Sequence, residues 1–186
     1  GGAHYLDLAD KAAFCAGITA VDPLARTAGR AAISGLSTVP AISSAAVRDL
    51  CGTETPLVID SAILPGNRSP RGLSVMASIL AQAGQPHPVY RGGHWTPTPG
   101  WSDPHDYPLP GGSTRQGWRI EVPDTRLFPA HFGARTVAFR AGLELGVMRY
   151  GLAAFATLRR RFPFPVPLPP VRPSRLAALP LAPLAP

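Results

Sequence analysis

Proline is concentrated at the carboxyl end of the chain. Nine of the 23 prolines fall in the last 25 of the 186 residues, from Phe162 onward. Proline has no backbone N–H and biases the residue before it away from helical dihedral angles, so this segment cannot continue a helix or join a sheet. We expect residues 162–186 to be an extended or disordered tail, with docking to a proline-recognising module as the alternative. The remaining residues, about 160, are enough to bury an apolar interior.

The positive charge is also concentrated in the carboxyl-terminal part of the chain. The formal net charge is +7, but residues 1–110 carry seven basic and eight acidic side chains, whereas residues 111–186 carry eleven arginines and three acids. Clustered arginines can bind the phosphates of nucleic acid. Here the arginines alternate with apolar residues in expected strands, which favours a place within a sheet, and we expect no nucleic-acid partner.

Residues 142–158 raise the question of a membrane. This stretch is apolar apart from Glu144 and Arg149, and three arginines follow it. It is shorter than the roughly 20 residues that a helix needs to span a bilayer, so we expect no transmembrane segment. A helix packed on the sheet or in a dimer is the interpretation we favour, and an amphipathic contact with a membrane surface is the alternative.

The residues present exclude several classes of site. Two cysteines, Cys15 and Cys51, form neither a disulfide framework nor a four-thiolate zinc site. The five histidines are dispersed, without metal-ligand spacing on one element, so we expect no metal. No Gly-x-Ser-x-Gly sequence surrounds Ser43 or Ser44, which argues against a serine hydrolase.

Residues 1–56 have the order of elements of a parallel α/β unit. The expected elements are a strand from His4 to Leu8, a helix with an N-cap at Asp10 that Pro23 kinks or restarts and Gly29 ends, a buried strand from Ala31 to Gly35 and a helix from Ala41 to Leu50. Strand–helix–strand–helix order is typical of a parallel sheet. Ligands of such sheets lie beyond the carboxyl ends of the strands.

Residues 57–161 predict a mixed α+β unit with its own sheet. The expected elements are a strand at 57–64, a helix at 73–83, a hairpin around Gly92 and Gly93, a long loop from Pro97 to Ser113, half-buried strands at 118–122 and 135–140, and a final helix at 142–158. Three arginines, Arg159 to Arg161, follow the final helix and complement the negative end of its dipole.

Several segments occur in an order that carries a family resemblance. They are Tyr5-Leu-Asp-Leu, Ala25-Arg-Thr-Ala-Gly29, Ile33-Ser-Gly-Leu-Ser-Thr-Val-Pro40, Ala62-Ile-Leu-Pro-Gly-Asn67 and Phe139-Arg-Ala-Gly-Leu-Glu144. Up to about residue 160, the chain resembles the saccharopine dehydrogenase-like oxidoreductases. The last two segments are similar to the branch of uncharacterised bacterial members. The resemblance implies NAD(P)-dependent oxidoreduction of a small-molecule substrate, a homodimer and a cytoplasmic location.

One departure from this family changes what the chain can do. Its members begin with a Rossmann strand and a Gly-x-Gly-x-x-Gly loop, and no such sequence occurs in these 186 residues. By the resemblance, that loop would lie upstream of Gly1. Without it, nothing presents backbone N–H groups and a helix N-terminus to a pyrophosphate. NAD(P) is therefore expected for the parent protein, and no cofactor is expected for the isolated fragment.

The expected fold class follows from the resemblance and this departure. We expect an α/β chain with a C-terminal remnant of a Rossmann-like parallel sheet at residues 1–56. An α+β substrate and dimerisation domain follows at 57–161, and the proline-rich disordered tail at 162–186.

The resemblance places candidate cofactor-binding residues at the ends of the two N-terminal strands. Tyr5 and Asp7 match a strand end near the nicotinamide. Being two residues apart, they point to the same side of a strand and could orient a ribose or a substrate amine. A hydrogen-bonded pair that bridges strand and helix is the alternative. Gly35, Ser37 and Pro40 match the next strand-end loop, where a small residue lets a cofactor approach, although turn chemistry explains them as well.

Arg68 and Arg71 are the candidate substrate-binding residues. They flank a loop rich in proline and glycine and could clamp a substrate carboxylate through paired hydrogen bonds. A solvated loop is the interpretation that we favour over this clamp. No residue is assigned to catalysis.

Overall fold

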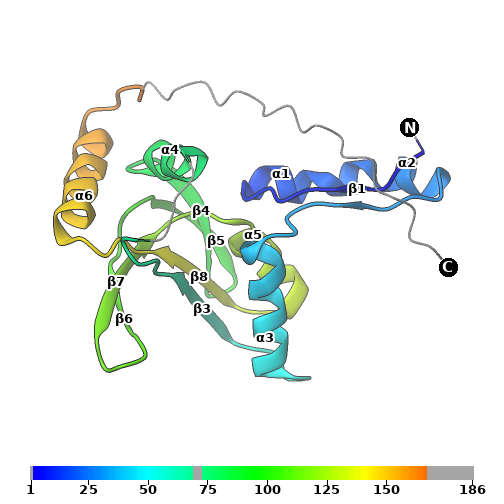
Figure 1. The fold of residues 1–186 in the computed structure, drawn as a ribbon, viewed down its shortest axis with the longest axis horizontal. Coiled ribbons are helices and arrows are strands. Elements are labelled where there is room, and N and C mark those ends of the chain that lie inside the picture. Colours follow the sequence, from blue (N-terminus) through cyan, green and yellow to red (C-terminus); the bar gives the residue numbers. More distant parts are fainter. Residues whose placement is uncertain (1, 69–72, 167–186) are drawn as a thin grey trace.

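The computed structural model describes residues 2–68 and 73–166 and has a mixed α/β fold. The larger sheet has six strands. Figure 1 shows helices around this sheet and a smaller N-terminal unit that projects to one side. All six strands of the larger sheet come from residues 58–141. The expected α/β class is confirmed at this coarse level.

The N-terminal unit is a parallel pair of very short strands joined by helices. β1 (Tyr5–Leu6) pairs with β2 (Ala32–Ile33). The connection consists of α1 (Ala12–Gly17), the 3-10 turn η1 (Ile18–Val21) and α2 (Asp22–Thr27). Pro23 lies in the first turn of α2, where its missing N–H costs no helical hydrogen bond. Its interpretation as the start of a second helix is therefore confirmed.

Two details of this unit differ from the prediction. The second strand is not buried, since Ile33 is 43% exposed and β1 is the only described strand beside it. The first helix begins after Lys11, so Asp10 is not its N-cap, and no side chain caps it. Gly29 does follow the end of α2, with a φ of +60° that favours glycine.

The chain then turns sharply before its third helix. A cis peptide bond joins Val39 to Pro40 within the irregular turn η2 (Thr38–Ile42), which leads into α3 (Ser43–Cys51). The hydroxyls of Ser43 and Ser44 both donate to the carbonyl oxygen of Pro40, at 3.1 and 2.6 Å. The helix expected from Ala41 thus begins two residues later, because this turn takes up the residues after Pro40.

The larger sheet is organised around its last strand. The six strands are β3 (Val58–Ile63), β4 (Pro86–Arg91), β5 (His94–Pro99), β6 (His105–Pro108), β7 (Thr114–Arg119) and β8 (Thr136–Ala141). β3 pairs in parallel with β8 along its whole length. On the other edge of β8, β4 pairs with the start of β8 and β7 pairs with the end of β8, both antiparallel. β5 and β6 pair with β4 and β7, and the hairpin expected at Gly92 and Gly93 is confirmed.

Two elements of this unit were not expected. Residues 97–113 are not one long loop, because β5 runs to Pro99 and β6 pairs with β7. A helix, α5 (Pro123–Phe132), was hidden by its prolines. Pro123 occupies the first helical turn, where proline is tolerated, whereas Pro129 lies inside the helix, where proline usually breaks it.

One strand and one helix of this unit have bounds that differ from the prediction. The strand expected at 118–122 is the end of β7, which stops at Arg119. The final helix, expected from Gly142, is α6 (Gly146–Arg161). Gly142 is held against the sheet instead, since a Cβ there would lie 2.6 Å from the carbonyl oxygen of Gln116.

Two apolar clusters fill the interior. The first lies between the sheet, α4 (Leu73–Gln82) and α6, and its buried members are Ile79, Ala83, Trp101, Trp118, Ile120, Val122, Phe139, Ala141, Leu143 and Ala156. The second lies under α5 and consists of Ile59, Phe128, Phe132, Ala134 and Val137. Val137, Phe139 and Ala141 are every second residue of β8 and therefore point to the same face of the sheet. Val137 belongs to the second cluster, and Phe139 and Ala141 belong to the first. α5 contacts α1 and α3 on one side and β4 and β8 on the other, so it joins the two units.

The expected tail is only partly described. Residues 163–166 form neither helix nor strand, and the Phe164 ring packs edge-on against Phe155 of α6 with centroids 5.9 Å apart. The interpretation of residues 167–186 lies outside the described residues. Within residues 2–68 and 73–166, no helix has the length and apolarity needed to cross a membrane.

Candidate functional site

A cleft of about 390 Å³ lies between the strand-end loops of the N-terminal unit and the larger sheet. Leu8, Asp10 and residues 37–39 form its N-terminal wall. The opposite wall comes from β3, α4, β8 and their loops, with Ile63, Pro65, Val75, Ser78, Ile79, Gln82, Ile120, Glu121, Val122, Phe139, Ala141, Gly142 and Leu143. The cleft therefore opens where β1 and β2 end, which is where parallel sheets bind ligands.

The walls of this cleft are mostly apolar, and their charge is negative. Glu121 and Asp10 are the charged residues of the described lining, and no Lys, Arg or His belongs to it. Glu121 is paired with Arg126 at 2.7 Å. Gln82 fixes the backbone of Glu121 in both directions, since its amide donates to the carbonyl oxygen at 3.1 Å and accepts from the N–H at 2.6 Å. An apolar molecule that is neutral or cationic suits this lining.

Asp7 ties the ends of β1 and β2 together. Its Oδ1 accepts hydrogen bonds from the N–H of Ala9 at 2.8 Å, the hydroxyl of Ser34 at 2.8 Å and the N–H of Gly35 at 3.0 Å. Partial burial works to raise the pKa of this carboxyl, but the hydrogen bonds outweigh it and lower the pKa to about 2. Asp7 thus positions both strand-end loops.

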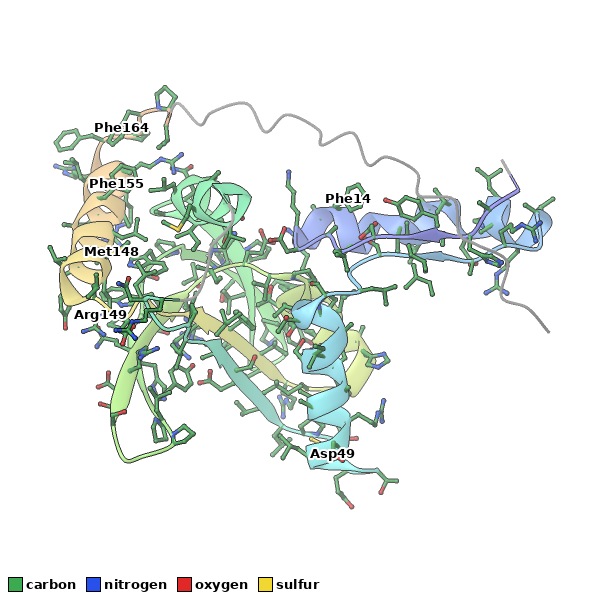
Figure 2. All side chains as sticks on the ribbon, in the orientation of Figure 1. Phe14, Asp49, Met148, Arg149, Phe155 and Phe164 are labelled. Atoms are coloured by element: carbon green, nitrogen blue, oxygen red, sulfur yellow. The ribbon has the colours of Figure 1, made fainter. Side chains whose placement is uncertain are left out.

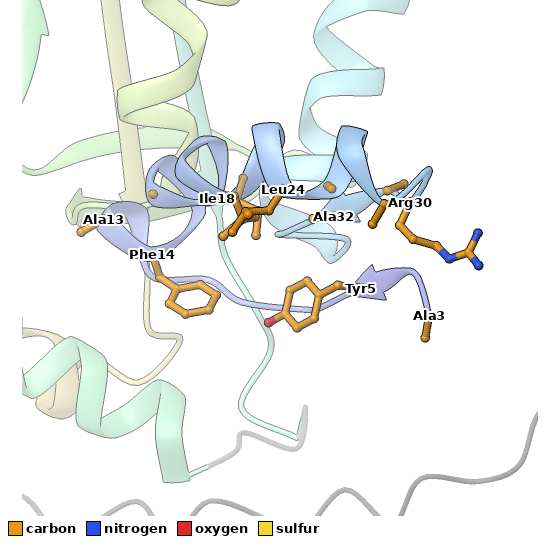
Figure 3. Close-up of a pocket in the computed structure, with 13 residues that line it drawn as sticks. Ala3, Tyr5, Ala13, Phe14, Ile18, Leu24, Arg30 and Ala32 are labelled. Atoms are coloured by element: carbon orange, nitrogen blue, oxygen red, sulfur yellow. The ribbon is translucent and has the colours of Figure 1, made fainter. Parts of the chain in front are cut away.

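Tyr5 lies beside Asp7, as the strand pattern predicts, but outside the cleft. Hydrogen bonding to Asp7 raises the pKa of its hydroxyl. The ring lines a separate apolar groove of about 630 Å³ between β1, α1 and α2. Figure 3 shows the rings of Tyr5 and Phe14 on one side of this groove, with Ile18 and Leu24 facing them. The assignment of Tyr5 and Asp7 to a cofactor stays a prediction.

The three residues expected in the second strand-end loop divide between two places. Ser37 lines the cleft, and its hydroxyl donates to the carbonyl oxygen of Val39 at 2.7 Å. Gly35 and Pro40 line a neighbouring hollow against α5. A Cβ on Gly35, whose φ is +79°, would lie 2.7 Å from Cδ of Pro40 and 3.3 Å from Sγ of Cys15. Glycine is therefore required here by close packing inside the fold.

The structure does not bring Arg68, one of the two candidate substrate arginines, to the cleft lining. Arg68 is exposed and is not among the residues that line the cleft. Arg71 lies outside the described residues. A carboxylate clamp by these two residues stays a prediction.

A cluster of charged residues that the sequence did not single out lies on the open face of the larger sheet. Arg140 of β8 is 5% exposed, and its Nη1 donates to both carboxylate oxygens of Asp60 at 3.0 and 2.9 Å. The same Nη1 donates to the hydroxyl of Tyr107 at 3.0 Å, and Nη2 donates to Asp103 at 3.0 Å. Burial, followed by the hydrogen bond to Asp60, raises the pKa of Tyr107 to about 12.

This Arg140 cluster is saturated by its own members. Asp103 also accepts a hydrogen bond from Nε of Arg119, and its φ of +49° turns the loop after Trp101 back toward the sheet. The groups therefore pin β3, β6, β7 and β8 to one another. The alternation of polar and apolar residues in β8 indicates which face of the sheet Arg140 is on. It does not indicate the partner of Arg140, because Asp60 is 80 residues away in the sequence.

Comparison of the chain with protein-family models and with curated proteins finds no match to either.

Proposed function

We propose that the chain is part of an NAD(P)-dependent oxidoreductase similar to the saccharopine dehydrogenase-like enzymes, with its substrate in the cleft. In this proposal residues 1–56 are the remnant of a Rossmann-like sheet, and residues 57–161 are the substrate and dimerisation domain. The observation that carries it is the cleft itself, which has the ends of β1 and β2 on one wall and the larger sheet on the other. Substrate and cofactor meet at such a boundary in open α/β folds.

The incomplete N-terminal sheet supports the same proposal. Parallel sheets normally have both faces covered, and two strands alone are marginally stable. β1 and β2 have two residues each, and Leu6 and Leu8 are 60% and 73% exposed. Phe14 and Leu24 of the flanking helices are exposed too. In this proposal, further strands and helices of the parent protein lie beside β1 and β2 and cover these side chains.

The residues of this chain do not suit the pyrophosphate of a dinucleotide. The end of β1 carries the carboxylates of Asp7 and Asp10, which repel phosphate. The helix that follows has six residues and starts after Lys11 without a glycine-rich turn. In this proposal the phosphate-binding loop therefore belongs to another part of the parent protein.

The lining of the cleft limits the chemical class of the substrate. Ile79, Phe139 and Leu143 offer apolar contacts, and the free carboxylate of the described lining is that of Asp10, since Glu121 is paired with Arg126. An apolar aldehyde, ketone or imine, neutral or with an amino group near Asp10, fits these walls better than a substrate whose anionic group must enter the cleft.

The experiment begins with the DNA immediately upstream of the codon for Gly1. An in-frame apolar strand followed by Gly-x-Gly-x-x-Gly is expected, and the longer protein should quench or enhance NADPH fluorescence on binding. The isolated 186-residue chain is the control and should leave NADPH fluorescence unchanged. A stop codon followed by a start site directly upstream, or a longer protein that binds neither NADH nor NADPH, overturns the proposal. Tight binding of NADPH by the isolated chain overturns the assignment of the phosphate site.

A further inference from the structure

Helix α6 is apolar on two opposite faces. Its inner face packs on the first apolar cluster through Met148, Leu152 and Ala156. On the outer face, Val147 is 81% exposed and Leu158 is 51% exposed. In Figure 1 α6 forms one side of the molecule, and no other element of the described chain lies beyond it. A helix that needed only to cover the sheet would have a polar outer face.

The outer face is a continuous stripe. Val147, Tyr150, Ala154 and Leu158 are three or four residues apart and all exposed, which places them on one side of the helix. Phe162, just beyond the helix, extends the stripe by one more turn and is exposed. The stripe is therefore about 16 residues long, or roughly 24 Å at 1.5 Å per residue.

The charge of α6 has one sign. The helix contains Arg149, Arg159, Arg160 and Arg161 and no acid. Arg159 is engaged, since its Nη1 donates to the carbonyl oxygens at the end of α4. Arg160 and Arg161 are exposed at the carboxyl end of the helix, where Arg161 lies on the side of the stripe and Arg160 lies nearer the inner face, four residues after Ala156. They form no ion pair with any described residue.

The acid that precedes the helix is not available to these arginines. Glu144 precedes the helix, and its carboxylate is held by Arg115 at 3.5 Å and by the N–H of Asn67. A second copy of α6 packed on the stripe would therefore bring unpaired arginines to a face without a free acid. Nucleic acid would neutralise the arginines but leave Val147 and Leu158 in water.

We propose that the outer face of α6 binds the surface of a bilayer that contains anionic lipid. An apolar stripe with arginines and aromatic residues at one end is typical of helices that lie in the membrane interface. Val147, Leu158 and Phe162 enter the acyl boundary, the Tyr150 hydroxyl lies at the headgroup level, and the long side chains of Arg160 and Arg161 reach lipid phosphates from the end of the helix. This inference is independent of the proposed oxidoreductase function.

The test is co-sedimentation of the full chain with two kinds of vesicle, one of phosphatidylcholine alone and one of phosphatidylcholine mixed with phosphatidylglycerol. Binding is expected to the mixed vesicles only, and to weaken with salt. Leu158→Glu should lower the partition coefficient about tenfold or more, because it places a carboxylate in the apolar stripe. Replacing Arg160 and Arg161 by Gln should lower it about fivefold for each arginine.

The matched control is Leu50→Glu, the same change at an exposed leucine of α3. Figure 2 shows α3, with Asp49 labelled, on the opposite side of the larger sheet from α6, where Met148 and Phe155 are labelled. This control should bind like the unchanged chain, and far-ultraviolet circular dichroism should confirm that all variants are folded.

Four results overturn the inference. One is absence of binding to the mixed vesicles, and another is an equal loss in Leu158→Glu and Leu50→Glu. The third is a dimer in light scattering that Leu158→Glu dissociates, which would assign the stripe to a second copy. Salt-sensitive retention on DNA that depends on the two arginines but not on Leu158 would assign them to nucleic acid instead.

Discussion

Asp124 provides a direct test of how burial controls the stability of this fold. It lies in the first turn of α5, is fully buried, and neither carboxylate oxygen accepts a hydrogen bond of normal geometry from a described residue. Burial raises the pKa of Asp124 from 3.8 to about 6, and the nearby hydroxyl of Ser43 offsets part of the effect. A carboxyl in this position stabilises the folded state only while it is protonated.

The sign and size of the effect follow from proton binding. Between pH 4 and pH 6 the folded chain holds the proton on Asp124 while the unfolded chain has lost it, so the free energy of unfolding falls as pH rises. A pKa raised from 3.8 to about 6 corresponds to about 3 kcal/mol at pH 7, of which about 2 kcal/mol is lost between pH 4 and pH 7. Asp124→Asn has no charge to bury and escapes this loss.

The measurement is urea unfolding of the unchanged chain and Asp124→Asn across pH 4 to 8. The variant should gain stability relative to the unchanged chain by about 2 kcal/mol on going from pH 4 to pH 7, whatever the amide itself costs. Asp49→Asn, the same substitution at an exposed site on α3, is the control and should change by less than about 0.5 kcal/mol. A stability difference for Asp124→Asn that is independent of pH, or that moves in the opposite direction, refutes the reasoning.

Three further predictions test packing and polar contacts. Gly84→Ala should lower the free energy of unfolding by about 2 kcal/mol or more, because a Cβ there would collide with the carbonyl oxygen of Ala156; urea unfolding measures it. Arg140→Met should cost about 3 kcal/mol in the same assay, because it leaves the Asp60 carboxylate without its buried ion-pair partner and removes one of the two buried arginines that bind Asp103. With dithionitrobenzoate near pH 8, Cys15 should react about tenfold more slowly than Cys51, since burial raises the pKa of the Cys15 thiol.

Each of these predictions has a matched control. Gly92→Ala also changes a glycine with positive φ, but its Cβ would meet no atom within 4 Å, so about 1 kcal/mol is expected. Arg26→Met breaks an exposed ion pair with Asp22 and should cost less than about 0.5 kcal/mol. Equal costs within either pair of variants would contradict the close approach or the buried ion pairs. Equal labelling of the two thiols would show that solvent reaches Cys15.

Local signals were sufficient for much of the fold. The strand–helix–strand order of residues 5–33, the restart of the helix at Pro23 and the hairpin at Gly92 depend on residues close together in the chain. α5 was missed because Pro129 normally ends a helix, and tertiary packing overrides that preference here. β6 was missed because His105 to Pro108 joins the sheet through backbone pairing with β7 and the contacts of Tyr107 with Asp60 and Arg140, which no local pattern shows.

The candidate site likewise has one part that local sequence patterns predicted and one part that they did not. The strand ends pointed to the N-terminal wall of the cleft, and Ser37 does line it. The opposite wall depends on how residues 63–143 fold back, which no local pattern encodes. Arg140 is the clearest case: its place on a polar face follows from alternation in β8, but its burial requires Asp60 from a strand 80 residues earlier.

The two surfaces for which partners are proposed lie on different sides of the molecule. The exposed apolar groups of β1, α1 and α2 belong to the N-terminal unit, whereas α6 closes the far end of the larger sheet (Figure 1). The further strands of a parent protein and a bilayer could therefore be bound at the same time without competing for residues. α5 contacts elements of both units and carries Asp124. Loss of NADPH binding in the longer protein with vesicle binding intact, or the reverse, would separate the two proposals.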